Sequence, residues 1–92
     1  MPDIVKEAEY IRNMVKNEMY DISPHANQRM NERNMSFEEL EDIILNHQYK
    51  LAKDEGNNER YEFYTSTKDK IIVALGTGMI IPVIVTVIKG GS

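Results

Sequence analysis

The sequence contains no cysteine, and this absence excludes several kinds of chemistry at once. Without thiol groups the chain has no disulfide, no thiolate zinc site and no cysteine nucleophile. No stretch approaches the roughly twenty apolar residues that a transmembrane helix requires. The N-terminus carries acidic side chains where a signal peptide has basic residues followed by an apolar run. We therefore expect a cytoplasmic protein without a membrane span.

The sequence also lacks an excess of basic residues, because its net charge is −4. Proteins that bind nucleic acid usually carry a basic footprint for the phosphates, so this charge argues against that class. The distribution of charge weakens the objection. Residues 1–35, 36–59 and 60–92 carry −1, −5 and +2, respectively. The acidity is concentrated in the middle segment, which leaves room for a locally positive surface elsewhere.

The first half of the chain has the spacing of helices. Apolar residues three or four positions apart predict an amphipathic helix over 2–19, through Ile4, Ala8, Ile11, Val15 and Met19. Ser23 as an N-cap and Pro24 at the first helical position predict a second helix over 23–34. Ser36 and Glu39 have the spacing of a capping box, which predicts a third helix that ends near residues 46–48.

The second half of the chain has the residue pattern of β-strands. Alternating or β-branched runs are separated by the turn-forming stretches DEGNNE and GTG. The chain therefore belongs to the α+β class, with three N-terminal helices on one face of an antiparallel sheet of about four strands. We expect one domain over 1–92, in which 2–19 is an additional helix, 23–88 is the core and 89–92 is a flexible tail.

Three cationic side chains recur at intervals of four in the second predicted helix: His25, Arg29 and Arg33. On a helix they form one row, which we call the cationic row. Ala26 and Met30 form the neighbouring row and are expected to pack on the sheet. The planar guanidinium group of arginine binds phosphate oxygens through paired N–H donors, and histidine exchanges protons near neutral pH. The row therefore suits an anionic substrate.

Other candidates lie in the predicted strands. The hydroxyl of Thr86 interrupts an apolar strand, so it is a candidate ligand contact. Arg60, Tyr61 and Tyr64 combine a cation with stacking surfaces, as contacts to nucleotides require. His47 continues the apolar stripe of the third helix and is expected at the edge of the core. The histidines and acids lack the spacing of metal ligands, so we expect no metal and no cofactor.

Each of these features also has a simpler interpretation. Charged rows are usually solvated helix faces, and Glu32 is placed to form a surface ion pair with Arg29. Threonine is a good strand former, and the residues around Arg60 are ordinary for a half-exposed hairpin.

The stretch SPHANQRMNERNMSFEELEDIIL resembles the signature of a small prokaryotic family known only as a domain of unknown function. The shared positions are Ser23, His25, Ala26, Arg29, Met30, Arg33, Ser36, Arg60, Tyr61, Val85, Thr86 and Val87. That family looks like a branch of the barnase–EndoU–colicin–RelE group of compact α+β ribonucleases and toxins. The resemblance implies that the histidine, the arginines and a polar residue of the last strand line an RNA-binding face. It also implies an antitoxin-like protein as partner.

Two functions from different classes follow. The first is a metal-independent ribonuclease of the toxin type, with His25 as general base or acid, Arg29 and Arg33 at the scissile phosphate, and Thr86 as a secondary contact. The second is a non-catalytic protein-binding module on the same fold, which uses the acidic segment 36–59 as its docking surface.

Overall fold

The computed structural model describes residues 3–55, 58–76 and 80–90, which form three helices and five strands. In chain order these elements are α1 (Ile4–Lys16), β1 (Asp21–Ile22), α2 (Pro24–Glu32), α3 (Phe37–Asn46), β2 (Gln48–Glu55), β3 (Asn58–Tyr64), β4 (Lys70–Gly76) and β5 (Val83–Ile88). The fold is α+β, as the sequence predicts. Within the described residues, no helix is long and apolar enough to span a membrane.

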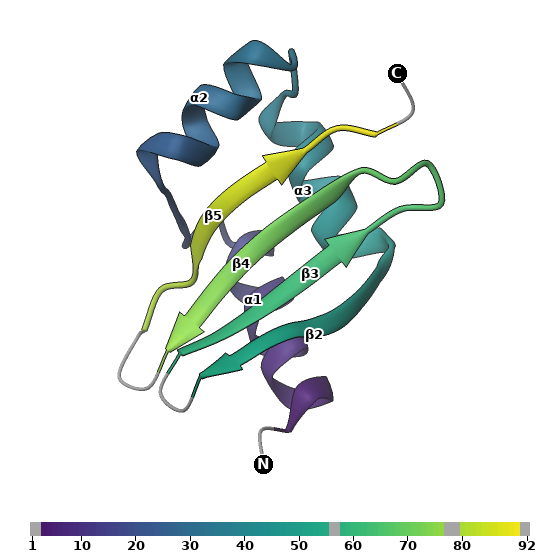
Figure 1. The fold of residues 1–92 in the computed structure, drawn as a ribbon. Helices are drawn as coiled ribbons and strands as arrows, with labels where there is room; N and C mark the ends of the chain where they lie inside the picture. Colours follow the sequence, from purple (N-terminus) through teal and green to yellow (C-terminus); the bar gives the residue numbers. More distant parts are fainter. Residues whose placement is uncertain (1–2, 56–57, 77–79, 91–92) are drawn as a thin grey trace.

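The helices and one face of the sheet share a single core (Figure 1). Side chains alternate along each strand, so the residues that face the helices are separated by residues that face away. The buried members come from all three helices, from the segment between α2 and α3, and from β3, β4 and β5: Ile11, Val15, Ala26, Met30, Met35, Leu40, Ile43, Ile44, Tyr61, Phe63, Ile71, Val73, Ile84 and Val87. No described helix covers the opposite face of the sheet, which we call the open face.

The sheet is mixed, which corrects the expectation of about four antiparallel strands. Its order is β1-β5-β4-β3-β2, and the additional strand β1 pairs in parallel with β5. The backbone N–H of Asp21 donates to the carbonyl of Pro82 at 3.0 Å, and that of Ser23 donates to the carbonyl of Ile84 at 2.9 Å. A strand of two residues is too short to show any alternation, so only its pairing partner reveals it.

The ends of the domain differ from the predicted bounds. α1 ends at Lys16, and the Met19 side chain lies beyond it, 49% exposed rather than on the buried stripe. At the C-terminus, Lys89 lies 3.6 Å from a carboxylate oxygen of Glu39. The backbone N–H of Gly90 donates to the Asp69 carboxylate at 2.8 Å. These contacts fix Lys89 and Gly90, which the sequence assigns to a flexible tail, against the domain.

The two predicted turns lie partly outside the described residues. Residues 56–57 belong to the stretch DEGNNE, and residues 77–78 belong to GTG. The strand pairs on either side of them are antiparallel, as hairpins require.

The N-terminus of α3 has half of the predicted capping box. The Ser36 hydroxyl accepts a hydrogen bond from the backbone N–H of Glu39 at 3.1 Å. The Glu39 carboxylate pairs with Lys89 rather than returning to the backbone of Ser36. The cap is therefore made by the serine side chain.

Replacing Ser36 by alanine is expected to lower the free energy of unfolding by about 0.5–2 kcal/mol, because one N–H of the first turn of α3 loses its acceptor. Urea titration measures this difference. Ser66→Ala is the matched control, since Ser66 is exposed and its side chain forms no hydrogen bond with the described residues. Equal stability of the two variants would contradict the proposed contribution of the cap.

Candidate functional site

α2 is held in place by its local sequence and by a long-range hydrogen bond. The Ser23 hydroxyl accepts a hydrogen bond from the backbone N–H of Ala26 at 3.1 Å, and Pro24 occupies the first helical position. The same hydroxyl donates to the carbonyl of Val85 in β5 at 2.9 Å. Ala26 and Met30 are buried, as their spacing predicts. Ser23 therefore both begins α2 and holds this end of the helix against β5.

The cationic row lies on the solvent side of α2. The side chains of His25 and Arg33 are exposed and form no hydrogen bond or ion pair with the described residues. The Arg29 side chain is 42% exposed, and its guanidinium lies 3.6 Å from a carboxylate oxygen of Glu32. An exposed pair of this kind contributes about 0–1 kcal/mol, so it leaves the guanidinium available to an anion.

A second group of candidate residues lies on the open face. Arg60 and Tyr64 alternate with the buried residues of β3, and Thr86 pairs with Ile72 of β4, so all three face away from the helices. The Lys50 ammonium lies 5.8 Å from the centroid of the Tyr64 ring. This group therefore contains cations, an aromatic ring and a hydroxyl.

Tyr61 corrects the prediction of a stacking surface. Its side chain is fully buried on the helix face of β3, so no base reaches its ring. Its hydroxyl donates to the carboxylate of Glu7 in α1 and also lies 3.1 Å from that of Glu59. Burial, followed by the hydrogen bond to Glu7, raises the pKa of the Tyr61 hydroxyl above its usual range. Tyr61 therefore joins α1 to the sheet as a neutral donor.

No hydrogen bond or ion pair between described residues joins the cationic row to the group on the open face. Three hollows on the described surface are lined by other residues, and none of these three includes a predicted site residue. The predicted site residues therefore lie outside these three hollows.

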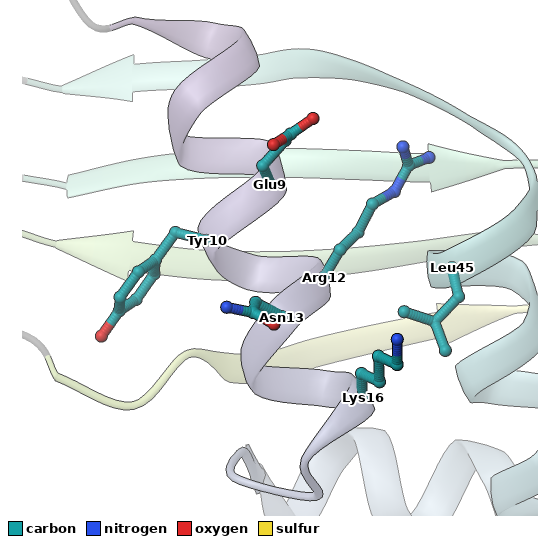
Figure 2. Close-up of a pocket in the computed structure, with 6 residues that line it drawn as sticks. All are labelled: Glu9, Tyr10, Arg12, Asn13, Lys16 and Leu45. Carbon is teal, nitrogen blue, oxygen red and sulfur yellow. The ribbon is translucent and has the colours of Figure 1, made fainter.

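The first hollow, of about 470 Å³, lies along α1 beside α3. Arg12 and Lys16 extend on the side of α1 where Leu45 lies, whereas Tyr10 points to the other side (Figure 2). The Arg12 guanidinium is already bound, because its Nε donates to the carbonyl of Ile44 at 2.8 Å. It also lies 4.9 Å from the centroid of the Tyr49 ring. The guanidinium of Arg12 is therefore engaged by contacts within the domain.

A second hollow, of about 210 Å³, is acidic and includes His47. His47 is the C-cap residue that follows α3, and its ring nitrogen Nε2 lies 3.3 Å from the Asp42 carboxylate. The His47 side chain is 39% exposed and lines this hollow together with the buried residue Ile43. Hydrogen bonds from Asn46 and His47 lower the pKa of the Asp42 carboxyl. Among the described residues, no cluster of three His, Cys, Asp or Glu residues is placed to hold a metal ion.

Comparison with known proteins adds no relative. No family model matches the chain, and neither a curated protein nor a solved structure matches it. The interpretation of the surface therefore rests on the geometry of its own residues.

Proposed function

We propose that this protein is a metal-independent ribonuclease of the toxin type, acting in the cytoplasm through the cationic row of α2. The observation that supports this proposal is the availability of His25, Arg29 and Arg33. The domain uses neither His25 nor Arg33 in a side-chain hydrogen bond or ion pair among its described residues, and it holds Arg29 only through one exposed pair.

The spacing of the row suits a polyanion. A helix rises about 1.5 Å per residue, so side chains four positions apart are about 6 Å apart along the axis. Two guanidinium groups and an imidazole spaced in this way offer successive contacts to the phosphates of one strand. Arginine provides paired donors for phosphate oxygens, which lysine does not provide in the same geometry.

The reaction that suits these groups is attack by the ribose 2′-oxygen on the adjacent phosphorus. His25 accepts the proton of the 2′-hydroxyl, the new bond from this oxygen to phosphorus forms, and the bond from phosphorus to the 5′-oxygen breaks. The 5′-oxygen takes a proton from water and leaves as a hydroxyl group. Arg29 and Arg33 stabilise the negative charge that grows on the phosphoryl oxygens in the transition state. The substrate supplies the nucleophile, so this mechanism has no role for a metal.

The open face provides secondary contacts in this proposal. Arg60 binds a further phosphate, the exposed part of Tyr64 stacks on a base, and Thr86 donates a hydrogen bond. A protein whose activity is directed at RNA needs control, and we propose an antitoxin-like protein as the natural partner.

The overall acidity favours the alternative function, a protein-binding module that has no catalytic activity. The segment 36–59 carries −5, and Glu38 on α3 is exposed without a side-chain partner among the described residues. A basic partner would be attracted to this surface.

Incubation of the purified protein with RNA tests the proposed activity. We expect cleavage products that end in a 2′,3′-cyclic phosphate, and no cleavage of the same oligonucleotide carrying 2′-O-methyl groups, because methylation removes the nucleophile. Mass spectrometry of the fragments identifies the ends. Intact RNA after incubation with folded protein would refute the ribonuclease and leave the protein-binding module.

A further inference from the structure

A third hollow, of about 330 Å³, lies between the segment that links α1 to β1 and the first turns of α3. We call it the Phe37 hollow. It is lined by Glu18, Tyr20, Ile22, Phe37 and Glu41. Three of these side chains are apolar or aromatic and two are acidic, so the hollow combines apolar walls with negative charge.

The walls contain an aromatic residue that the core does not use. Phe37 is the first residue of α3, and its side chain is 56% exposed. Met19, next to the lining residue Glu18, is 49% exposed. An exposed ring in the wall of a hollow adds apolar surface that a partner can cover.

One carboxylate of the hollow is held in place. The Tyr20 hydroxyl donates to Oε2 of Glu41 at 2.7 Å. Burial, followed by this hydrogen bond, raises the pKa of Tyr20 above its usual range, so the hydroxyl remains a donor. The second oxygen of Glu41 forms no hydrogen bond with the described residues. It is therefore available to a donor that enters the hollow.

The other carboxylate occupies a position that is locally unfavourable. Glu18 follows the C-cap of α1 with a φ of 59°, in the left-handed region that favours glycine. Its N–H donates to the carbonyl of Val15, and that of Met19 donates to the carbonyl of Met14, which together form a Schellman motif. An acidic side chain at the C-terminus of a helix is also opposed by the helix dipole.

The corresponding position of α2 shows the contrast. There the left-handed residue is Asn34, with a φ of 54°, and asparagine tolerates this conformation. The carboxylate of Glu18 forms no hydrogen bond or ion pair with the described residues, so the fold gains no side-chain contact from it that offsets its local cost. Its charge is available to a ligand from outside.

We propose that the Phe37 hollow binds an arginine side chain presented by a protein partner. The guanidinium stacks on the aromatic wall and donates to Glu41 and Glu18, while a neighbouring apolar residue of the partner covers Ile22. Arginine is preferred to lysine because its planar group both stacks and donates in pairs. A metal ion is a poorer occupant, since the hollow offers two carboxylates beside apolar walls. This inference does not depend on the ribonuclease proposal.

Titration with the tripeptide acetyl-Leu-Arg-Leu-amide, followed by ¹H–¹⁵N correlation spectra, tests this site. We expect saturable shifts confined to residues 18–22 and 37–41. The peptide with citrulline in place of arginine keeps the shape and loses the charge, so it should bind about three- to tenfold more weakly. The protein variants Glu18→Gln and Phe37→Ala should weaken binding of the arginine peptide to a similar extent. Both side chains are exposed, so the variants should fold.

Two further variants separate binding at the hollow from other effects. Glu9→Gln removes the same charge from an exposed position of α1 outside the Phe37 hollow and should leave binding unchanged. Glu18→Gly should raise the melting temperature, because glycine suits the left-handed position, and should weaken binding as Glu18→Gln does. Absent or scattered shifts, equal binding of the citrulline peptide, or equal effects of Glu9→Gln and Glu18→Gln would each overturn the proposal.

Discussion

Replacing His25 by alanine is expected to slow RNA cleavage by about 10²–10⁴-fold, the usual contribution of a positioned proton acceptor. The melting temperature should stay close to that of the wild type, because the His25 side chain is exposed and unpaired among the described residues. Initial rates on a labelled oligonucleotide, together with a thermal melt, measure the two effects separately.

Three comparisons define the role of the cationic row. Asn27→Ala changes an exposed side chain of α2 outside the row and should leave the rate unchanged. Arg29→Lys should reduce the rate although it keeps the charge, since lysine lacks the paired donors. EDTA should have no effect. If the His25→Ala protein cleaves RNA as fast as the wild type, His25 is not the proton acceptor and the catalytic assignment of the row fails.

Replacing Arg12 by alanine is expected to lower the free energy of unfolding by about 2–3 kcal/mol, from hydrogen bonds of a charged donor and a cation–π contact. The guanidinium donates to the carbonyls of Ile44 and His47 at the end of α3. It also lies over the rings of Tyr49 and Phe63, at 4.9 and 5.7 Å from their centroids. Because α3 has no basic residue in its last turn, Arg12 supplies the cation that its C-terminus favours.

Denaturant titration and a thermal melt measure this effect, and a loss of this size lowers the melting temperature by about 10–20 °C in a domain of this length. Lys16→Ala is the matched control, because Lys16 is an exposed cation of the same helix without a partner among the described residues. Arg12→Lys should fall between the two, since one ammonium cannot reproduce both hydrogen bonds and the stacking. Equal stability of the Arg12→Ala and Lys16→Ala proteins would show that Arg12 is not the cap of α3.

Features that depend on neighbouring residues follow from the amino-acid sequence alone. Ser23 and Ser36 mark the starts of α2 and α3, because each cap is a hydrogen bond to an N–H three residues along the chain. The buried positions of α2 follow from the helical period. The alternation in RYEFY also places Tyr61 with Phe63 on one face of β3 and Arg60 with Tyr64 on the other. The prediction that Tyr61 contacts nucleotides is wrong because it groups residue types without regard to this alternation.

Features that join distant parts of the chain arise only from the packing of the folded domain. β1 forms because the backbone N–H of Asp21 donates to the carbonyl of Pro82. A strand of two residues has no sequence pattern that predicts this partner. The role of Arg12 depends on carbonyls more than thirty positions away, which no local spacing reveals. The Phe37 hollow likewise combines the end of α1 with the start of α3. Backbone periodicity fixes which face a side chain occupies, whereas packing decides which side chains from distant elements meet on that face.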